Sequence, residues 1–126
     1  MSSTADLDAE RVRAAKNQSL LREVNERIED LAEGKPSIFE DLQRSRMIDL
    51  ACECMDATCT DRVAMTIAEY EEIRADSNTF FVRPGHHVPD VEVIVRQAAD
   101  YVVVSKLGAG AVVAERLDPR KRRRIT

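Results

Sequence analysis

Three cysteines lie within eight positions of this chain, at Cys52, Cys54 and Cys59, and its two histidines are adjacent, at His86 and His87. Thiolate and imidazole are the ligands that Zn²⁺ favours in proteins, and a structural zinc usually takes four of them in a tetrahedron. A Cys-x-Cys pair can place two sulfur atoms on the same side of an extended segment. The turn-like stretch that follows could bring the third sulfur back towards them. The spacing therefore predicts a fold stapled by a metal ion.

A histidine would complete the ligand set. We expect His86 in this role because it directly follows the turn at Pro84-Gly85 and because side chains alternate after a strand, while His87 remains the alternative. A closed set of four ligands contributes folding energy and leaves no open position for a catalytic water. We therefore predict a structural Zn²⁺. Its ligands are Cys52, Cys54, Cys59 and His86.

Other readings of the cysteines remain open. Free cysteine behaves as a small hydrophobic residue and is often buried without any metal. A redox or metal-sensing role is a further possibility. A 2Fe–2S cluster with three cysteines and one histidine would imply electron transfer. Proteins of that type hold the third cysteine and the histidine close together in sequence, whereas Cys59 and His86 are 27 positions apart here.

A metal ion that cross-links the chain would help to stabilise a domain of this size and composition. Its 126 residues suit one domain with an arm or tail, and a hydrophobic content of 44% argues against wholesale disorder. Aromatic residues make up only 4% and there is no tryptophan, so the large side chains that dominate most small cores are scarce. A domain of this kind gains from a metal that closes its loops.

A long amphipathic helix is predicted over residues 6–33. An apolar stripe at helical spacing runs along it, consisting of Leu21, Val24, Ile28 and Leu31. Gly34 and Pro36 supply a stop signal. Two good heptads fall short of a coiled coil. The stripe can pack on the chain's own domain, or it can pair with a protein partner or a second copy.

Two capping boxes indicate further helices. Ser37–Glu40 has this pattern and predicts a short helix that ends near Arg46. Thr66–Glu69 has the same pattern and is flanked by Met65 and Tyr70, which are spaced to form a hydrophobic staple. The second box predicts a helix to about Ala75.

The remaining segments predict short strands and a final element. Alternation over 48–52 and the β-prone run 80–82 indicate one strand each. Valine-rich runs at 91–95 and 101–104 suggest a β-hairpin, although the first also fits a helical stripe. A turn at Gly108–Gly110 and a short element over 111–116 end the domain. The fold class is therefore α+β, with an N-terminal amphipathic helix in 1–36, a zinc-stapled domain in 37–118 and a basic disordered tail in 119–126.

Charge is distributed unevenly along the chain. Residues 120–124 carry five positive charges, and removing them from the 19 basic residues leaves 14 against 23 acidic ones. The body should therefore repel nucleic acid, whereas the tail could bind phosphates in a salt-sensitive way. No interleaved aromatic residues and no basic helix face support base readout. A nucleic-acid- or ribosome-associated protein that acts through residues 120–124 is the alternative function.

Several classes of protein are not supported by any motif. The N-terminus is polar and acidic and no run of apolar residues is long enough to span a membrane, so a cytoplasmic protein without disulfides is expected. A nucleophile elbow, a phosphate-binding glycine loop and an HExxH helix are all missing from the sequence. We therefore expect a non-catalytic, zinc-binding interaction or regulatory protein.

Several runs of this sequence resemble a family of small bacterial proteins, mostly actinobacterial. They include the Cys-x-Cys-x4-Cys run at 52–59, the Thr-x-x-Glu-Tyr-Glu-x-x-Arg run at 66–74, Pro84-Gly85-His86 and Asp118-Pro119-Arg120. The likeness covers most of residues 18–120 and implies that the cysteine and histidine positions belong to one family pattern. It brings no activity with it. The chain departs from the pattern at His87, where an acidic residue is more usual, and in the basic extension at 121–124.

Overall fold

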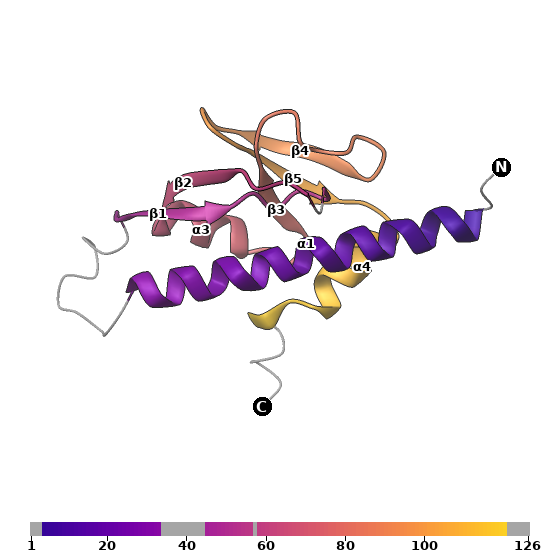
Figure 1. Cartoon of the computed structure of the whole chain (residues 1–126), viewed down its shortest axis with the longest axis horizontal. Helices are drawn as coiled ribbons and strands as arrows, with labels where there is room; N and C mark the ends of the chain where they lie inside the picture. The colour runs from indigo at the N-terminus through magenta and orange to yellow at the C-terminus, as the bar shows by residue number, and fades with distance from the viewer. Residues whose placement is uncertain (1–3, 34–44, 57, 121–126) are drawn as a thin grey trace.

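A long N-terminal helix and two small sheets make up the computed structural model, which describes residues 4–33, 45–56 and 58–120. Helix α1 (Thr4–Glu33) spans the length of the molecule (Figure 1). The predicted helix over 6–33 and the α+β class are confirmed. The short helix predicted from Ser37 to about Arg46 falls largely on residues 34–44, outside the described residues.

The first sheet is an antiparallel pair, β1 (Met47–Ala51) and β2 (Arg62–Thr66). Every second residue of each strand is buried, so that Ile48 lies opposite Met65 and Leu50 lies opposite Val63. The strand predicted over 48–52 is confirmed, although it ends one residue earlier. Strand β2 was not predicted, because only two buried positions in five residues mark its alternation.

Helix α3 (Ile67–Arg74) follows β2 without a loop. Its N-cap is the predicted capping box: the hydroxyl of Thr66 accepts a bond from the backbone N–H of Glu69, and the Glu69 carboxylate accepts one from the N–H of Thr66, both at 3.1 Å. Met65 and Tyr70, the predicted staple, belong to the same buried cluster. Local sequence therefore fixes where this helix begins.

The second sheet contains β3 (Thr79–Val82), β4 (Glu92–Gln97) and β5 (Val102–Lys106), antiparallel in the order β3-β5-β4. The predicted strand at 80–82 and the predicted hairpin are confirmed. Helix α4 (Ala109–Arg116) follows. The turn predicted over Gly108–Gly110 is wrong in extent, because only Gly108 adopts a positive φ, of 62°. Gly110 lies inside the helix, where a Cβ would come within 2.9 Å of Lys106.

Two hydrophobic clusters lie on either side of β3. Phe81 joins the first, with β1, β2 and α3, while Phe80 and Val82 join the second, with β5 and α4. The second cluster also contains Cys52 and Cys54. Two of the predicted metal ligands therefore lie at the edge of the core.

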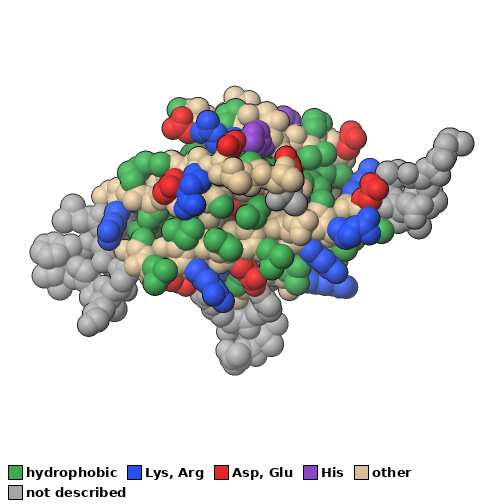
Figure 2. Space-filling model, viewed as in Figure 1, with side chains coloured by type: hydrophobic (Ala, Val, Ile, Leu, Met, Phe, Trp, Pro, Cys, Tyr) green, Lys and Arg blue, Asp and Glu red, His purple; other side chains and the backbone are tan. Residues whose placement is uncertain are grey.

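The buried face of α1 is polar, not apolar. It consists of Ala15, Gln18, Ser19, Arg22, Asn25, Glu26 and Glu29. Val24 and Leu31, both in the predicted stripe, are 48% and 84% exposed. Packing of this stripe on the chain's own domain is therefore wrong for Val24 and Leu31, whereas Ile28 does pack against the first hydrophobic cluster. Figure 2 shows hydrophobic side chains between charged ones on the side of the molecule where α1 lies in front.

The domain supplies hydrogen-bond partners for part of this buried polar face. The guanidinium of Arg22 donates to the backbone carbonyls of Ser77 at 2.6 Å and Ala114 at 2.7 Å, and it stacks over Phe80. Gln18 donates to the carbonyl of Glu53. Buried polar groups are tolerated when such bonds replace those to water.

Candidate metal centre

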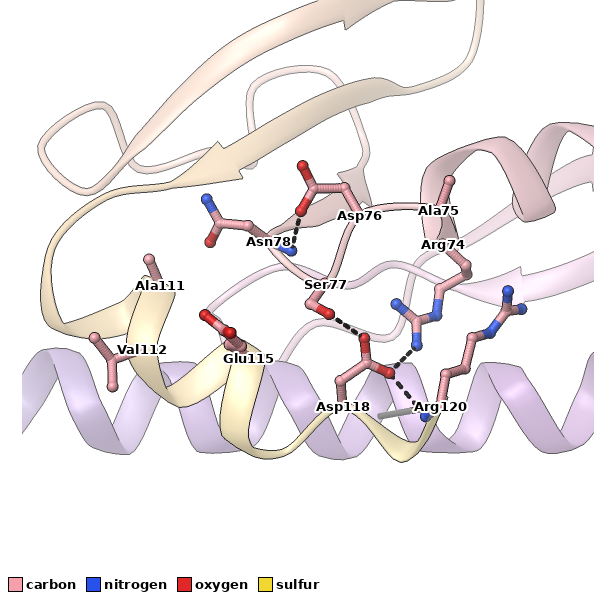
Figure 3. A pocket seen from close by; sticks show the side chains of 10 residues that line it. All are labelled: Arg74, Ala75, Asp76, Ser77, Asn78, Ala111, Val112, Glu115, Asp118 and Arg120. Carbon is pink, nitrogen blue, oxygen red and sulfur yellow. Dashed lines mark hydrogen bonds and ion pairs between the residues drawn. The ribbon is translucent and has the colours of Figure 1, made fainter. Parts of the chain in front are cut away.

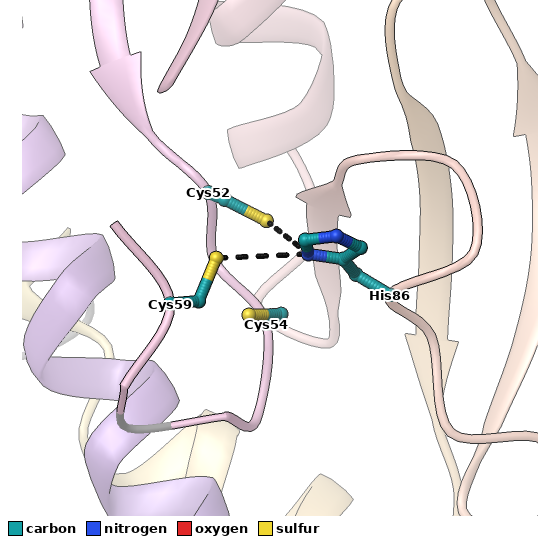
Figure 4. A group of neighbouring side chains, drawn as sticks. All are labelled: Cys52, Cys54, Cys59 and His86. Carbon is teal, nitrogen blue, oxygen red and sulfur yellow. Dashed lines mark hydrogen bonds between the residues drawn. The ribbon is translucent and has the colours of Figure 1, made fainter. Parts of the chain in front are cut away.

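The four predicted ligands come together from two separate loops (Figure 4). Cys52 and Cys54 directly follow β1, and Cys59 lies in the loop that leads to β2. His86 belongs to the loop between β3 and β4. One ligand atom from each residue lies within 4.8 Å of all the others. The structure therefore brings together all four residues that the sequence singled out.

Backbone hydrogen bonds hold these loops in place. The N–H of Cys52 donates to the carbonyl of Asp61 at 3.0 Å, which folds the cysteine loop back on itself. The N–H of Glu53 donates to the carbonyl of Phe81, also at 3.0 Å, and so joins the loop to β3. The predicted turn at Pro84-Gly85 forms, with Gly85 at a φ of 88° that favours glycine. It presents His86 to the sulfur atoms.

Two nitrogen–sulfur distances within the group are close to those between ligands of one tetrahedral metal ion. The Nδ1 atom of His86 lies 3.7 Å from the Sγ of Cys52 and 3.6 Å from the Sγ of Cys59. In a tetrahedron with Zn–S near 2.3 Å and Zn–N near 2.0 Å, a sulfur and a nitrogen are about 3.5 Å apart. The side chains therefore have the spacing of ligands around one ion.

Asp61 contacts the His86 ring on the side away from the sulfur atoms. Its carboxylate lies 3.4 Å from the Nε2 atom of His86, which leaves Nδ1 turned towards the sulfurs. Metal-bound histidines commonly donate their other N–H to a carboxylate, which fixes the ring and its tautomer. Among the described residues, the group of possible ligands includes His86 but not His87. The choice of His86 over His87 thus agrees with the geometry.

Burial makes the free thiols hard to ionise. It raises the pKa of Cys52 well above the ordinary value, and the neighbouring Cys54 raises it further, against the opposing effect of the Arg83 N–H that donates to its sulfur at 3.2 Å. Burial also raises the pKa of Cys54. Without a cation these thiols hold their protons at neutral pH, so a bound metal must displace them.

Glu53 separates the two cysteines and points the opposite way, into the core. Its carboxylate accepts bonds from Asn25 at 2.9 Å, from the Tyr70 hydroxyl at 3.3 Å and from the N–H of Phe81 at 3.3 Å. Burial raises its pKa to about 7, although the bonds from Asn25 and Phe81 oppose the shift. Sequence reasoning missed this role. The alternation in Cys52-Glu53-Cys54 was the available signal, since neighbouring side chains of an extended segment face opposite sides.

No family model, curated protein or solved structure matches this chain. The resemblance to an actinobacterial family therefore stays a prediction, and the site is argued from its own geometry. In the described part of the chain, no helix combines the length and apolarity that a membrane span requires.

A second polar cluster lies where α1, α3 and the C-terminal segment meet. The buried guanidinium of Arg74 pairs with Glu26 at 2.5 Å. It also pairs with Asp118 at 2.6 Å, and the hydroxyl of Ser77 donates to Asp118 (Figure 3). Burial alone would raise the pKa of Asp118, but Ser77 and Arg74 outweigh it and lower the pKa to about 2. An open cavity of about 620 Å³ adjoins this cluster. The charged residues just described pair with one another, so they have a structural role.

Arg120, which the sequence assigned to the tail, belongs to the same cluster. Its guanidinium lies 2.8 Å from Glu26, 2.9 Å from Glu71 and 3.4 Å from Glu29. Glu26 and Glu71 already compensate its charge. The predicted binding of nucleic acid would therefore depend on residues 121–124, which lie outside the described residues.

Proposed function

We propose that this protein is a small zinc-binding module in which Cys52, Cys54, Cys59 and His86 hold one structural Zn²⁺. In this role it is a non-catalytic interaction or regulatory protein. The observation that carries the proposal is the convergence of three sulfurs and one imidazole nitrogen within 4.8 Å. The spacing of the nitrogen from two of these sulfurs is that of a tetrahedral site.

The position of the group supports a structural role. A metal held by these residues would join the loop after β1 to the loop after β3, which are connected otherwise by backbone hydrogen bonds. Four protein ligands fill a tetrahedron and leave no position for a reacting water. Because an unfolded chain has no preformed site, the free energy of metal binding would add to that of folding.

The compactness of the group favours a single ion over an iron–sulfur cluster. A 2Fe–2S cluster distributes its four ligands between two irons, so ligands on different irons lie farther apart than ligands on one ion. Here each pair of ligand atoms lies within the same 4.8 Å limit. Zinc also matches the mixture of thiolate and imidazole ligands.

Elemental analysis of the purified protein tests the proposal. We expect one zinc per chain and no visible absorbance from iron. The Cys54→Ser variant should lose the metal and unfold at a lower temperature, because one ligand is missing. His86→Ala should lose metal likewise, whereas His87→Ala, at the adjacent histidine, should keep it. A wild-type protein without metal, or a His86→Ala variant with a full zinc content, would overturn the proposal.

A further inference from the structure

One of the three candidate sulfur ligands is within reach of solvent. Cys52 and Cys54 are buried, each with 1% exposure, whereas Cys59 is only partly buried. The side chains that border the group are open as well, since His86 is 33% exposed and Asp61 is 52% exposed. A small oxidant in solution can therefore reach the sulfur of Cys59 before it reaches the other two.

A second sulfur lies next to that of Cys59. The thiol of Cys54 interacts with the thiols of both Cys59 and Cys52. A short turn keeps Cys59 close to Cys54: the N–H of Cys59 donates to the carbonyl of Asp56 at 3.1 Å, and the Asp56 carboxylate accepts two bonds from Thr58. A thiol beside an oxidised cysteine is the arrangement in which a disulfide forms.

Cys54 is a better disulfide partner for Cys59 than Cys52 is. The sulfur of Cys52 is held by the N–H of Arg83, which donates to it at 3.2 Å. The sulfur of Cys54 instead contacts the carbonyl of Asp56 at 3.8 Å, in the turn that leads to Cys59. A bond between Cys52 and Cys54 is disfavoured, because residues two apart on an extended segment have Cα atoms about 6.6 Å apart, near the upper limit for a disulfide.

We propose that the zinc centre is a reversible thiol switch, in which a peroxide joins Cys54 and Cys59 as a disulfide and releases the Zn²⁺. This inference rests on the proposed zinc site and adds its regulation. After oxidation only Cys52 and His86 remain as ligands, which are too few to close a tetrahedron. The backbone bond from Glu53 to β3 involves none of these sulfurs, so it keeps the loop in place and reduction can rebuild the site.

The oxidation consumes one molecule of peroxide in two steps. The Cys59 thiolate attacks one peroxide oxygen, the O–O bond breaks and hydroxide leaves, so that Cys59 becomes a sulfenic acid. The Cys54 thiolate then attacks the sulfur of Cys59, the S–O bond breaks and a second hydroxide leaves. Both hydroxides take up protons from solvent and become water. Each sulfur has then lost one electron and the peroxide has gained two, while Zn²⁺ leaves and the thiolate of Cys52 takes up a proton.

Zinc release from the whole chain, reduced and loaded with zinc, tests the switch. Hydrogen peroxide should release all of the bound zinc to a chromophoric chelator, and a dithiol reductant with added zinc should restore the original content. Free thiols are alkylated before the disulfide is reduced, and the newly freed thiols are alkylated with a second reagent. Peptide mapping by mass spectrometry should then find the second label on Cys54 and Cys59 and the first label on Cys52.

Two serine variants separate the disulfide pairing from the metal. Cys52→Ser removes one ligand but keeps both sulfurs of the proposed disulfide, so peroxide should still join Cys54 to Cys59. Cys54→Ser is the matched variant and should form no disulfide within the chain.

The possible results of these measurements can be told apart. Zinc that stays bound under peroxide, or zinc that is lost without any second label, would overturn the switch. A disulfide that includes Cys52 would overturn the pairing of Cys54 with Cys59. A wild-type protein that is purified without zinc would instead overturn the proposed metal centre.

Discussion

Asn25 of α1 donates a hydrogen bond of 2.9 Å to Glu53, the residue between two of the candidate metal ligands. The same side-chain amide donates to the carbonyl of Ala51 at 2.8 Å and accepts from its N–H at 2.9 Å. One asparagine therefore fixes the segment that leads from β1 into the cysteine loop. The candidate metal centre and the long helix belong to one structural unit.

Asn25→Ala should lower the free energy of unfolding by about 1–3 kcal/mol, because it leaves buried partners at Ala51 and Glu53 unsatisfied. Urea unfolding at constant zinc concentration measures the effect. Asn17→Ala, an exposed asparagine of the same helix, is the control and should change stability by about 0.5 kcal/mol or less. Equal stability of the two variants would contradict the structural role of Asn25.

Asp61→Asn should weaken zinc binding by about tenfold to a hundredfold, because the variant loses the carboxylate that orients and polarises His86. Competition with a chromophoric chelator measures the affinity. Asp90→Asn, at an exposed position in the loop that also carries His86, should bind zinc as the wild type does. An unchanged affinity for Asp61→Asn would show that the carboxylate does not act on the histidine.

The Asp118 carboxyl should contribute to the acid sensitivity of the fold. Its pKa is lowered to about 2 in the folded protein, so its contribution to stability is present above the unfolded value near 3.8 and is lost as pH falls towards 2. Asp118→Asn should cost about 3 kcal/mol at pH 7, because it breaks a buried ion pair, and should lose less stability than the wild type between pH 5 and 2. Unfolding measured across this range gives both quantities.

A second aspartate provides the comparison for this acid titration. Asp49 is paired with Arg62 on the surface, where its side chain is 62% exposed. Asp49→Asn should therefore change stability by about 1 kcal/mol or less. If Asp49→Asn destabilised the fold as much as Asp118→Asn does, burial of the Arg74 ion pairs would add nothing to stability.

Glu29 should make the fold less stable as pH rises, which is the opposite of the effect of Asp118. Burial and a hydrogen bond with Glu71 raise its pKa to about 9, so folding takes up a proton and this contribution to stability is lost as pH rises from about 4.5 to 9. Glu29→Gln keeps a neutral side chain at every pH. The variant should match the wild type at pH 5 and exceed its stability by about 1 kcal/mol or more at pH 9. Thermal unfolding of both proteins, with Glu10→Gln as an exposed control, decides whether this slope belongs to Glu29.

Local sequence carried enough information for the four candidate metal ligands and for most of the elements. The three cysteines fall in one loop, the Pro84-Gly85 turn precedes His86, and the Thr66 capping box marks the start of α3. Each of these signals acts over a few residues. Such short-range patterns translate directly into backbone geometry.

The burial of α1 could not be predicted in the same way. A stripe of apolar residues normally marks the face that packs inwards, yet Leu31 is exposed and Arg22 is fully buried. The partners that make this possible lie far away in sequence, as Ala114 does for Arg22, 92 positions on. Strand β2 was missed for a different reason, since Val63 and Met65 alone give too short an alternation.

The pairing of Glu26 sets a limit on when the helix can dock during synthesis. This carboxylate bonds to Arg74, 48 residues further on, and to Arg120, 94 residues further on. As the nascent chain leaves the ribosome, α1 emerges long before either guanidinium. Its acidic side chains therefore stay hydrated until these partners are available, and the pairing of Glu26 is complete only after translation has passed Arg120.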